Sequence, residues 1–316
     1  DGSTPTVVVP RLELAALQPS AVTELGLRVT DWVDGVSPYD IVSGMLPSGA
    51  ATAVDDAMPA LHFVPLADKL GRTPVLATEV LRRLRMLKDD SEIAALRRAG
   101  QAIDRVHARM GEFLKVGRTE AAVAADIGDA IVAEGHTEAA FIIVGSGPHG
   151  ADPHHEVSDR VIEVGDVVVI DIGGPVDPGY NSDSTRTYVL GEPSSEIAAQ
   201  YAVLERAQQA AVDAVAPGVT AEAIDAAARD ILVAEGLGEA FLHRTGHGIG
   251  LSVHEEPYIV AGNDIELVDG MAFSIEPGIY FRGHWGARIE DIVIVTADGC
   301  ESVNQRPHGL VSLPID

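Results

Sequence analysis

The sequence contains an internal repeat, and this repeat constrains the fold more than any other feature. The motif Ser-Glu-Ile-Ala-Ala occurs at Ser91–Ala95 and again at Ser195–Ala199. Three further matches follow in the same order with small gaps: Gly117–Thr119 with Gly218–Thr220, Ala133–Gly135 with Ala234–Gly236, and Ala140–Phe141 with Ala240–Phe241. Self-similarity at a fixed spacing indicates a duplicated structural unit. We therefore predict two similar halves, each made of two helices followed by strands.

The repeat extends into two apolar segments that each contain one acid. Gly165 lies six residues before Asp171, and Gly270 lies six residues before Glu276. The two carboxylates therefore hold equivalent positions in the two halves. If the halves face each other about a pseudo-twofold axis, the carboxylates converge, which predicts a shared metal site between them.

A second acid lies near Asp171. The sequence predicts an apolar strand over 167–172, a turn, and a returning strand over 181–188. The two-residue alternation of a strand puts Asp183 on the same face as Thr185. Asp171 and Asp183 can therefore meet across a hairpin.

The second half has a matching pair of acids, Glu276 and Glu290, in segments predicted to be the apolar strands 272–278 and 287–294. Burying a lone carboxylate costs several kcal/mol, roughly, unless it is paired, protonated or bound to a metal. An ion-paired strand carboxylate is the ordinary interpretation of any one of these acids. Four such acids in two repeat-related pairs favour a metal site.

The histidines divide into a clustered and an isolated group. His243, His247 and His254 lie close together in one segment, and His154 is adjacent to His155. Clusters of this kind are typical of active sites and metal sites. The isolated histidines are interpreted as structural or surface residues: His62, His107, His136, His149, His284 and His308.

Two short motifs suggest other chemistry, and neither fits its context. The segment His254–Tyr258 begins like the zinc-binding motif HExxH, but Tyr258 stands where the second histidine must be. The segment Gly145–Gly150 matches GxGxxG after an apolar strand, but Pro148 and the residues after it do not begin the helix that a dinucleotide fold needs. Nucleotide binding is kept only as an alternative class.

The charge of the chain limits its partners. The formal net charge is −26, whereas nucleic acids and anionic lipids are bound by basic surfaces, so we expect no nucleic acid and no membrane as partners. The single cysteine, Cys300, allows no internal disulfide, and no apolar run approaches the length of a membrane span. Because no export leader opens the sequence, we predict a cytoplasmic protein.

The chain divides by composition near residue 82, where a long Arg-, Ala- and Leu-rich helical pattern begins. We predict a first domain over 1–81 and a catalytic domain over 82–316. The first domain is predicted to begin with a short strand over 6–10 and a helix over 12–27, and it carries no evident chemistry.

Five separated segments, in order, resemble the pita-bread metallopeptidases, most closely the Xaa-Pro dipeptidases (prolidases) and aminopeptidase P. The resemblance covers residue 82 to the C-terminus. It implies an α+β pita-bread domain with a pseudo-twofold repeat, preceded by a smaller α/β creatinase-like domain whose beginning is absent. The segments are Asp171, Gly179–Thr187, the stretch containing His247 and His254, Ile275–Gly278, and Arg288–Asp291.

The resemblance also implies roles for individual residues. His154, His254 and Glu276 would take part in catalysis, whereas His243 and Arg288 would contact or support the substrate site. Asp183 and Glu290 would bridge two metal ions. The full set of metal ligands implied by the resemblance is Asp171, Asp183, His247, Glu276 and Glu290.

The chemistry of such a ligand set can be argued independently. Four carboxylates and one imidazole form an oxygen-rich site without thiolate, which suits manganese best, or cobalt or zinc, better than copper or an iron–sulfur cluster. Two divalent ions would lower the pKa of a bridging water towards about 7, so that a metal-bridging hydroxide could attack the scissile carbonyl. His254 or His154 would stabilise the oxyanion, and Glu276 would shuttle a proton.

The resemblance implies an Xaa-Pro dipeptidase that acts on small proline-containing peptides and forms a homodimer. The alternatives are an aminopeptidase P that acts on longer Xaa-Pro peptides, a metal-free pita-bread binding module, and a creatinase-like hydrolase without metal. The intact ligand set argues against the last two. Arg282 and Arg288 are the candidates for binding the carboxylate of a dipeptide.

Overall fold

The computed structural model describes residues 5–47 and 49–315, and the chain divides into two compact units, Asp1–Leu81 and Arg82–Asp316. The smaller unit contains two pairs of parallel strands, β1 with β2 and β3 with β4. Its elements are β1 (Thr6–Pro10), η1 (Arg11–Glu13), α1 (Leu14–Leu17), β2 (Arg28–Trp32), α2 (Pro38–Met45), β3 (Ala53–Val54), α3 (Ala60–Leu70) and β4 (Val75–Leu76); α4 (Thr78–Met86) then runs into the larger unit.

The predicted strand over 6–10 is confirmed as β1, but the predicted helix over 12–27 is wrong. Only the short η1 and α1 are helical there, and turns follow. Pro19 lacks a backbone N–H and cannot continue a helix, and the Ser20 hydroxyl donates to the Leu17 carbonyl just after α1 ends. The Ala- and Leu-rich composition therefore outweighed a stop signal that the sequence contains.

The two halves predicted from the repeat are present in the larger unit. Its first half contains α5 (Asp90–Ala108) and α7 (Glu120–Ala133), and its second half contains α8 (Ser195–Asp213) and α9 (Ala221–Ala234). The first helices of the two halves both have 19 residues, and the second helices both have 14. Thr119 and Thr220, which match in the repeat, are the N-cap residues of α7 and α9.

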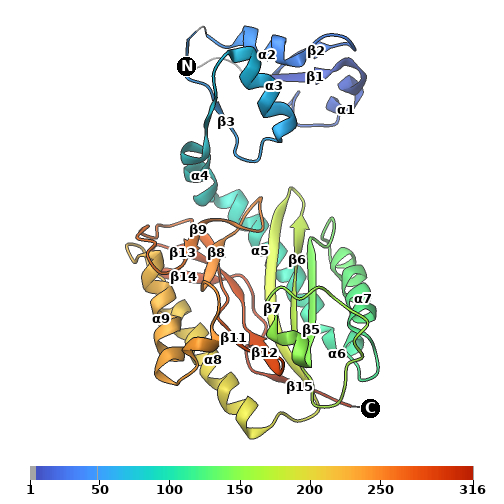
Figure 1. The fold of residues 1–316 in the computed structure, drawn as a ribbon, viewed down its shortest axis with the longest axis vertical. Helices are drawn as coiled ribbons and strands as arrows, with labels where there is room; N and C mark the ends of the chain where they lie inside the picture. Colours follow the sequence, from blue (N-terminus) through green and yellow to red (C-terminus); the bar gives the residue numbers. More distant parts are fainter. Residues whose placement is uncertain (1–4, 48, 316) are drawn as a thin grey trace. The chain divides into compact units, whose positions relative to one another are not determined.

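The strands of the larger unit form two main sheets, with orders β15-β7-β6-β5 and β14-β13-β10-β8-β9, and a separate β11–β12 hairpin. Figure 1 shows these strands in the middle of the unit, with α7 on one side and α8 and α9 on the other. The remaining elements of this unit are α6 (Met110–Phe113), β5 (Phe141–Ser146), η2 (Gly147–Ala151), β6 (Val167–Val176), β7 (Tyr180–Leu190), η3 (Gly238–Ala240), β8 (Gly246–Gly248), β9 (Glu255–Ile259), β10 (Ala272–Ile275), β11 (Gly278–Phe281), β12 (Trp285–Arg288), β13 (Asp291–Thr296), β14 (Gly299–Ser302) and β15 (Val311–Leu313).

Each half builds its own hydrophobic core. One core joins α5, α6 and α7 to β5, β6 and β7, and the other joins α8 and α9 to β10 and β13. A third, smaller cluster contains Leu96 of α5, Tyr180 of β7 and Ile292 of β13. Each half is therefore packed around its own core, and the third cluster joins the halves through α5, β7 and β13. Within residues 5–47 and 49–315, no helix is both long and apolar enough to span a bilayer.

Two of the acids lie at strand ends, which differs from the predicted strands over 272–278 and 287–294. Glu276 follows the last residue of β10, and Pro277 separates it from β11. Glu290 lies between the end of β12 at Arg288 and the start of β13 at Asp291. Proline cannot donate to a strand ladder, so Pro277 ends the strand that leads to Glu276. Glu290 lies in the two-residue connection between β12 and β13.

The GxGxxG segment does not open an α-helix. Gly145 and Ser146 end β5, and the short 3-10 helix η2 follows over Gly147–Ala151. Because a dinucleotide fold uses the N-terminus of a full helix to bind the pyrophosphate, this segment lacks the element that such a function needs.

Candidate active site

The β6–β7 hairpin brings Asp171 and Asp183 to one face of the sheet. In the antiparallel register Asp171 pairs with Thr185, and Gly173 pairs with Asp183. The two acids are therefore diagonal neighbours, and both are buried, at 8% and 4% exposure. The hairpin predicted from the sequence is present, and Asp183 lies two residues along β7 from the residue that pairs with Asp171.

His247 is held where two strands approach unusually closely. A Cβ on Gly246 would lie 1.8 Å from the Ser274 carbonyl oxygen, so only glycine fits beside β10. The His247 backbone N–H donates to Ser274 Oγ at 3.0 Å, and Ser274 Oγ donates to Glu276 Oε1 at 3.1 Å. One serine thus fixes both the imidazole segment and the neighbouring carboxylate.

The acids of both halves converge on this imidazole. His247 Nε2 lies 3.2 Å from Glu276 Oε1 and 3.5 Å from Asp183 Oδ2. Ligand atoms of Asp183, His247 and Glu290 all lie within 4.8 Å of one another. Asp171, the fourth acid, is bound by Arg288, whose Nη2 donates to Asp171 Oδ2.

The protonation state of His247 suits a ligand role. Its Nδ1 lies 3.1 Å from the Gly248 carbonyl oxygen, which can only accept, so Nδ1 carries the proton and Nε2 presents a lone pair to the acids. Burial, reinforced by the adjacent His254, lowers the pKa of His247 to about 3. A neutral imidazole lone pair facing carboxylate oxygens is repulsive unless a cation or a proton lies between them.

The carboxylates show the same need for a cation. Burial first, and then the neighbouring acids, raise the pKa values of Asp183 and Glu290 well above their ordinary range, and burial raises the pKa of Glu276 to about 7. Asp171 Oδ1 and Glu290 Oε1 are buried without a hydrogen-bond partner. Unpaired buried oxygens and repelling acids fit divalent cations, which are hard and prefer oxygen ligands.

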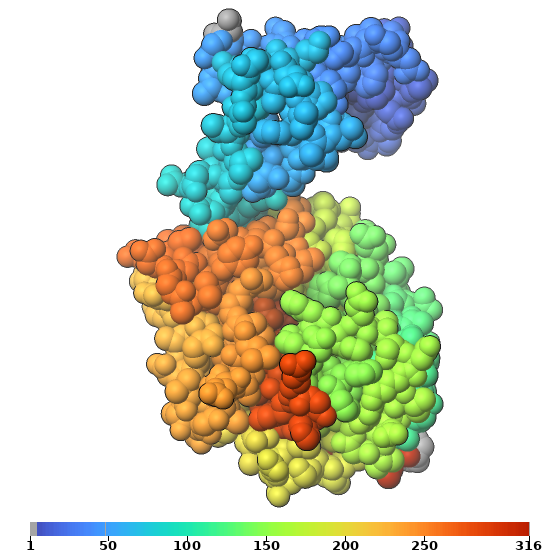
Figure 2. Space-filling view, in the orientation of Figure 1, coloured from blue at the N-terminus to red at the C-terminus, as the bar shows by residue number. Residues whose placement is uncertain are grey.

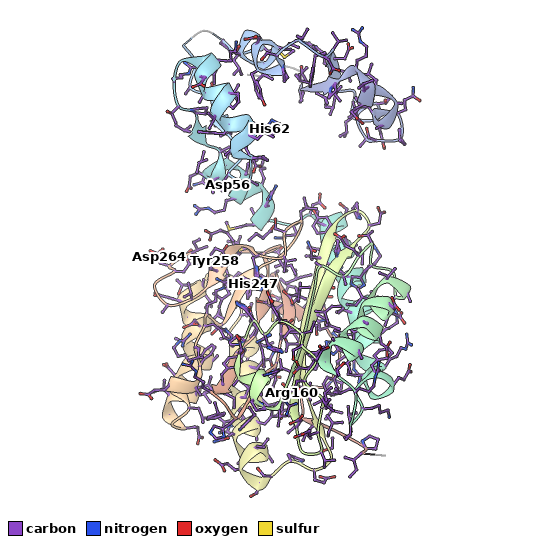
Figure 3. All side chains as sticks on the ribbon, turned by 45° about the vertical axis from the view of Figure 1, so that its right-hand side comes forward. Asp56, His62, Arg160, His247, Tyr258 and Asp264 are labelled. Carbon is purple, nitrogen blue, oxygen red and sulfur yellow. The ribbon has the colours of Figure 1, made fainter. Side chains whose placement is uncertain are left out.

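These groups lie in a pocket of about 780 Å³. All nine site residues predicted from the sequence line it, and among them His154 and His254 are exposed. In Figure 2 the green segment around residue 150 and the orange segment around residue 250 face each other across the front of this unit. In Figure 3 His247 lies among the strands of the larger unit.

His243 and Arg288 belong to a hydrogen-bonded chain beside the acids. His243 Nδ1 donates to the Arg244 carbonyl at 2.7 Å, and its Nε2 accepts from the Tyr280 hydroxyl at 2.8 Å. Arg288 Nη1 donates to the same hydroxyl at 2.7 Å. Burial, with the charge of Arg288, lowers the pKa of His243 to about 4, so this imidazole is neutral and both its nitrogens are occupied.

Two sequence-based interpretations change. Arg282 is exposed and does not line the pocket, so it is poorly placed to bind a substrate carboxylate. His155, grouped with His154 in the sequence, does not line the pocket; its Nε2 lies 2.8 Å from Glu120 Oε2 instead. Adjacent residues in a loop point in different directions, which spacing alone does not reveal.

Sequence reasoning missed three residues. Tyr280 links His243 to Arg288, and Arg244 lines the pocket with its guanidinium 4.7 Å above the Tyr258 ring. Asp225 is buried on α9, and its Oδ1 accepts from the Thr245 N–H at 3.1 Å and the Thr245 hydroxyl at 2.8 Å. Only Asp225 carried a signal, since it is an acid on the otherwise apolar face of a predicted helix.

The fold and the site together define a class. The model of metallopeptidase family M24 matches residues 94–297. The chain belongs to metallopeptidase family M24, so it is a metallopeptidase with the pita-bread fold and a smaller N-terminal domain. The family resemblance and the fold class predicted from the sequence are both confirmed.

The chain is similar in sequence to several peptidases of this family. A probable dipeptidase PepE from Mycobacterium tuberculosis is 70% identical over 312 residues, which is 98% of this chain and 83% of that protein. The Xaa-Pro dipeptidase of Lactobacillus delbrueckii subsp. lactis is 41% identical over 240 residues, covering 75% of this chain and 65% of that protein.

The chain is also similar in structure to solved peptidases. The crystal structure of dipeptidase PepE from Mycobacterium ulcerans superposes with a TM-score of 0.94 at 67% identity, covering 99% of this chain and 84% of that one. A prolidase from Thermococcus sibiricus superposes with a TM-score of 0.90 at 40% identity, covering 98% and 84%.

Proposed function

We propose that this metallopeptidase is an Xaa-Pro dipeptidase that uses two divalent metal ions. The observation that carries the proposal is the set of four carboxylates around one neutral imidazole, with two unpaired buried oxygens, on the wall of a peptide-sized pocket. The Xaa-Pro dipeptidase and prolidase names of the relatives support the substrate class.

The ions would be held by Asp171, Asp183, His247, Glu276 and Glu290. Manganese is the first choice for such an oxygen-rich set, and cobalt or zinc is also compatible with it. When bound, the ions supply Lewis acidity and bring the pKa of water near neutrality. Two observations support the binding of divalent ions by these residues: the unpaired oxygens of Asp171 and Glu290, and the free lone pair of His247.

The side chains of the pocket supply the remaining chemistry. Glu276 lines the pocket, and its carboxylate can both accept a proton from water and donate it to the leaving proline nitrogen. His254 and His154 are exposed to the pocket and can donate to the developing oxyanion of the scissile carbonyl. Arg288 and Tyr280 orient the acids through their hydrogen bonds.

The pocket also offers features for a dipeptide. Phe141, Ile143, Val253 and Val260 give it apolar lining that suits a proline ring. Arg244 lines the pocket and, among the residues that the structure describes, has no carboxylate within salt-bridge distance. Its guanidinium is therefore available for the C-terminal carboxylate of a dipeptide.

The test is product analysis with Gly-Pro and with longer Gly-Pro-X peptides in the presence of Mn²⁺. Rapid release of proline from Gly-Pro, with little cleavage of the longer peptides, is expected. Cleavage of Gly-Pro-X in preference to Gly-Pro would identify an aminopeptidase P instead. Binding of these peptides without any hydrolysis, at full metal occupancy, would contradict both activities. A purified protein that binds no metal would favour the metal-free binding module.

We propose two further properties, the first on family resemblance and the second on the sequence. We expect a homodimer, and sedimentation at micromolar concentration that gives the mass of one chain would refute it. We expect residence in the cytoplasm, which fits the single cysteine, Cys300. Fractionation of cells that express the protein tests the second expectation.

A further inference from the structure

A second polar cluster lies outside the group of acids, around Glu120 at the first turn of α7. Glu120 is completely buried. Its Oε1 accepts from the Ser146 N–H at 2.9 Å and from the Ser146 hydroxyl at 2.6 Å. Its Oε2 accepts from His155 Nε2 at 2.8 Å and the Ser158 hydroxyl at 2.6 Å, and His149 Nδ1 lies 3.1 Å from both oxygens.

This carboxylate remains ionised. Burial alone would raise its pKa, but the hydrogen bonds from Ser146, Ser158 and His155 outweigh burial and lower the pKa of Glu120 to about 2. An ionised carboxylate can only accept, so His155 Nε2 and His149 Nδ1 both carry protons. Arg160, which is labelled in Figure 3, donates to Ser146 Oγ at 2.6 Å, so the Ser146 proton points to Glu120.

The donors span the loop that carries His154. Ser146 ends β5, His149 lies in η2, and His155 and Ser158 follow Pro153 and His154. Glu120 therefore holds the loop before and after His154, while His154 itself points into the pocket.

A second contact ties this loop to the acids. The Pro153 carbonyl accepts from Arg288 Nη1 at 3.4 Å, and Arg288 also donates to Asp171. The loop is thus fixed by Glu120 at its base and by Arg288 next to His154. Any shift of the loop would change the distance between the His154 ring and the acids.

The second half has no carboxylate at the position equivalent to Glu120. Thr119 matches Thr220, so the counterpart of Glu120 in the second half is Ala221. The two positions are both completely buried, yet only the first carries an acid. The three groups that could ligate a metal here, Glu120, His149 and His155, already satisfy one another by hydrogen bonds, so the cluster needs no cation.

We propose that Glu120 is the positioning residue of His154: its buried carboxylate fixes the loop 146–158 so that the His154 imidazole is held at the reaction centre. The proposal rests on the proposed peptidase activity, in which His154 contacts the substrate. It predicts that loss of the Glu120 charge acts on turnover through His154 and through no other group.

A double-mutant cycle tests this with Gly-Pro as substrate and metal content measured for every variant. Glu120→Gln keeps the side-chain volume but places an amide against the Ser158 and His155 donors. With metal content unchanged, kcat is expected to fall roughly 10- to 100-fold, as a misplaced catalytic group would cause, while KM changes little. In the His154→Ala background the same substitution is expected to change kcat by less than about twofold.

Equal fold-losses of kcat in both backgrounds would overturn the proposal. Asp126→Asn is the matched control, because Asp126 lies on the same helix and is paired on the surface with Arg118 at 2.6 Å. This variant should leave kcat unchanged. If Glu120→Gln does not fold, Ser158→Ala removes one donor and keeps the carboxylate; its smaller loss of kcat must likewise vanish in the His154→Ala background.

A readout independent of activity separates this proposal from the proposed function. With ¹³C-labelled histidine, the ring signal of His154 is assigned by its loss in His154→Ala. One sharp signal is expected in the wild type and in Asp126→Asn, and a broadened or doubled signal in Glu120→Gln. An unchanged sharp signal in Glu120→Gln would refute the positioning role even if no Xaa-Pro peptide is cleaved, whereas an inactive wild type with the expected signals would refute only the function.

Discussion

His247 and His254 contact each other edge to face, with ring centroids 4.1 Å apart, but their surroundings differ. His247 is buried with its Nε2 lone pair among the acids, whereas His254 is exposed to the pocket. We therefore expect His247→Ala to lose bound metal. We expect His254→Ala to keep it while kcat falls roughly 10²–10³-fold, as when an oxyanion donor is lost. Metal analysis and turnover of both variants provide the measurement.

Each variant is the control for the other, because the two rings are neighbours and both substitutions remove an imidazole. Loss of metal from His254→Ala to the same extent as from His247→Ala would show that the two residues share one role. Retention of metal by His247→Ala would remove it from the proposed ligand set.

His107 gives a pH-dependent contribution to stability. It is buried, its Nδ1 lies 2.9 Å from the Tyr188 hydroxyl, and burial lowers its pKa to about 3 from the ordinary 6.5. Between about pH 3 and pH 6.5, His107 therefore binds a proton in the unfolded chain but not in the folded chain. This contribution to the unfolding free energy is fully present above pH 6.5 and is lost as the pH falls from 6.5 towards 3, by up to about 1.4 kcal/mol per pH unit.

The measurement is denaturant unfolding of the wild type and of His107→Gln between pH 7.5 and pH 4.5. Gln cannot titrate, so the variant is expected to lose less unfolding free energy over this range, although it is less stable at pH 7.5. Parallel pH dependences of the two proteins would show that His107 is protonated in the folded state.

At the level of the strands, the approach of β8 to β10 depends on glycine. A Cβ on Gly246 would meet the Ser274 oxygen at 1.8 Å, whereas a Cβ on Gly309 would meet no atom within 4 Å. Gly246→Ala should therefore cost at least about 1–3 kcal/mol of unfolding free energy and displace His247, with loss of metal affinity. Gly309→Ala is the control and should change neither property in thermal melts and metal titrations.

A stable Gly246→Ala protein with normal metal content would mean that β8 and β10 can separate without consequence for the site. Such a result would also weaken the argument that Ser274 fixes His247 and Glu276 together, because that argument needs the two strands in contact.

The helices and the hairpin were predictable because they depend on local pattern and on the repeat. The matched helices of the two halves and the meeting of Asp171 with Asp183 follow from period and register alone. The false helix over 12–27 came from weighing composition above Pro19. Tyr280 and Arg244 could not be found, because their roles depend on which strands neighbour one another, and no spacing in the chain encodes that.

For the whole molecule, the repelling acids make stability depend on metal and pH together. Without ions, burial and mutual repulsion raise the pKa values of Asp183, Glu276 and Glu290. The folded chain then binds protons that the unfolded chain releases, so this contribution to stability is present below about pH 4 and is lost as the pH rises through the raised pKa values. Ions replace those protons and are bound best where the protons are released.

We therefore expect Mn²⁺ to raise the melting temperature of the chelator-treated protein more at pH 7.5 than at pH 5.5. Differential scanning calorimetry with chelator and with re-added Mn²⁺ at both pH values gives the comparison. His247→Ala is the control and should gain much less. An equal or larger gain at pH 5.5 would contradict the linkage between protons and metal.

The candidate ligands are divided between the two halves: Asp171 and Asp183 belong to the first, and His247, Glu276 and Glu290 belong to the second. A half-length ancestor could therefore have assembled such a set only when two copies met. Joining the copies through the short connection between β7 and α8 turns that encounter into an intramolecular event at a high effective concentration. The two halves differ at equivalent positions, as the acid at 120 and the alanine at 221 show.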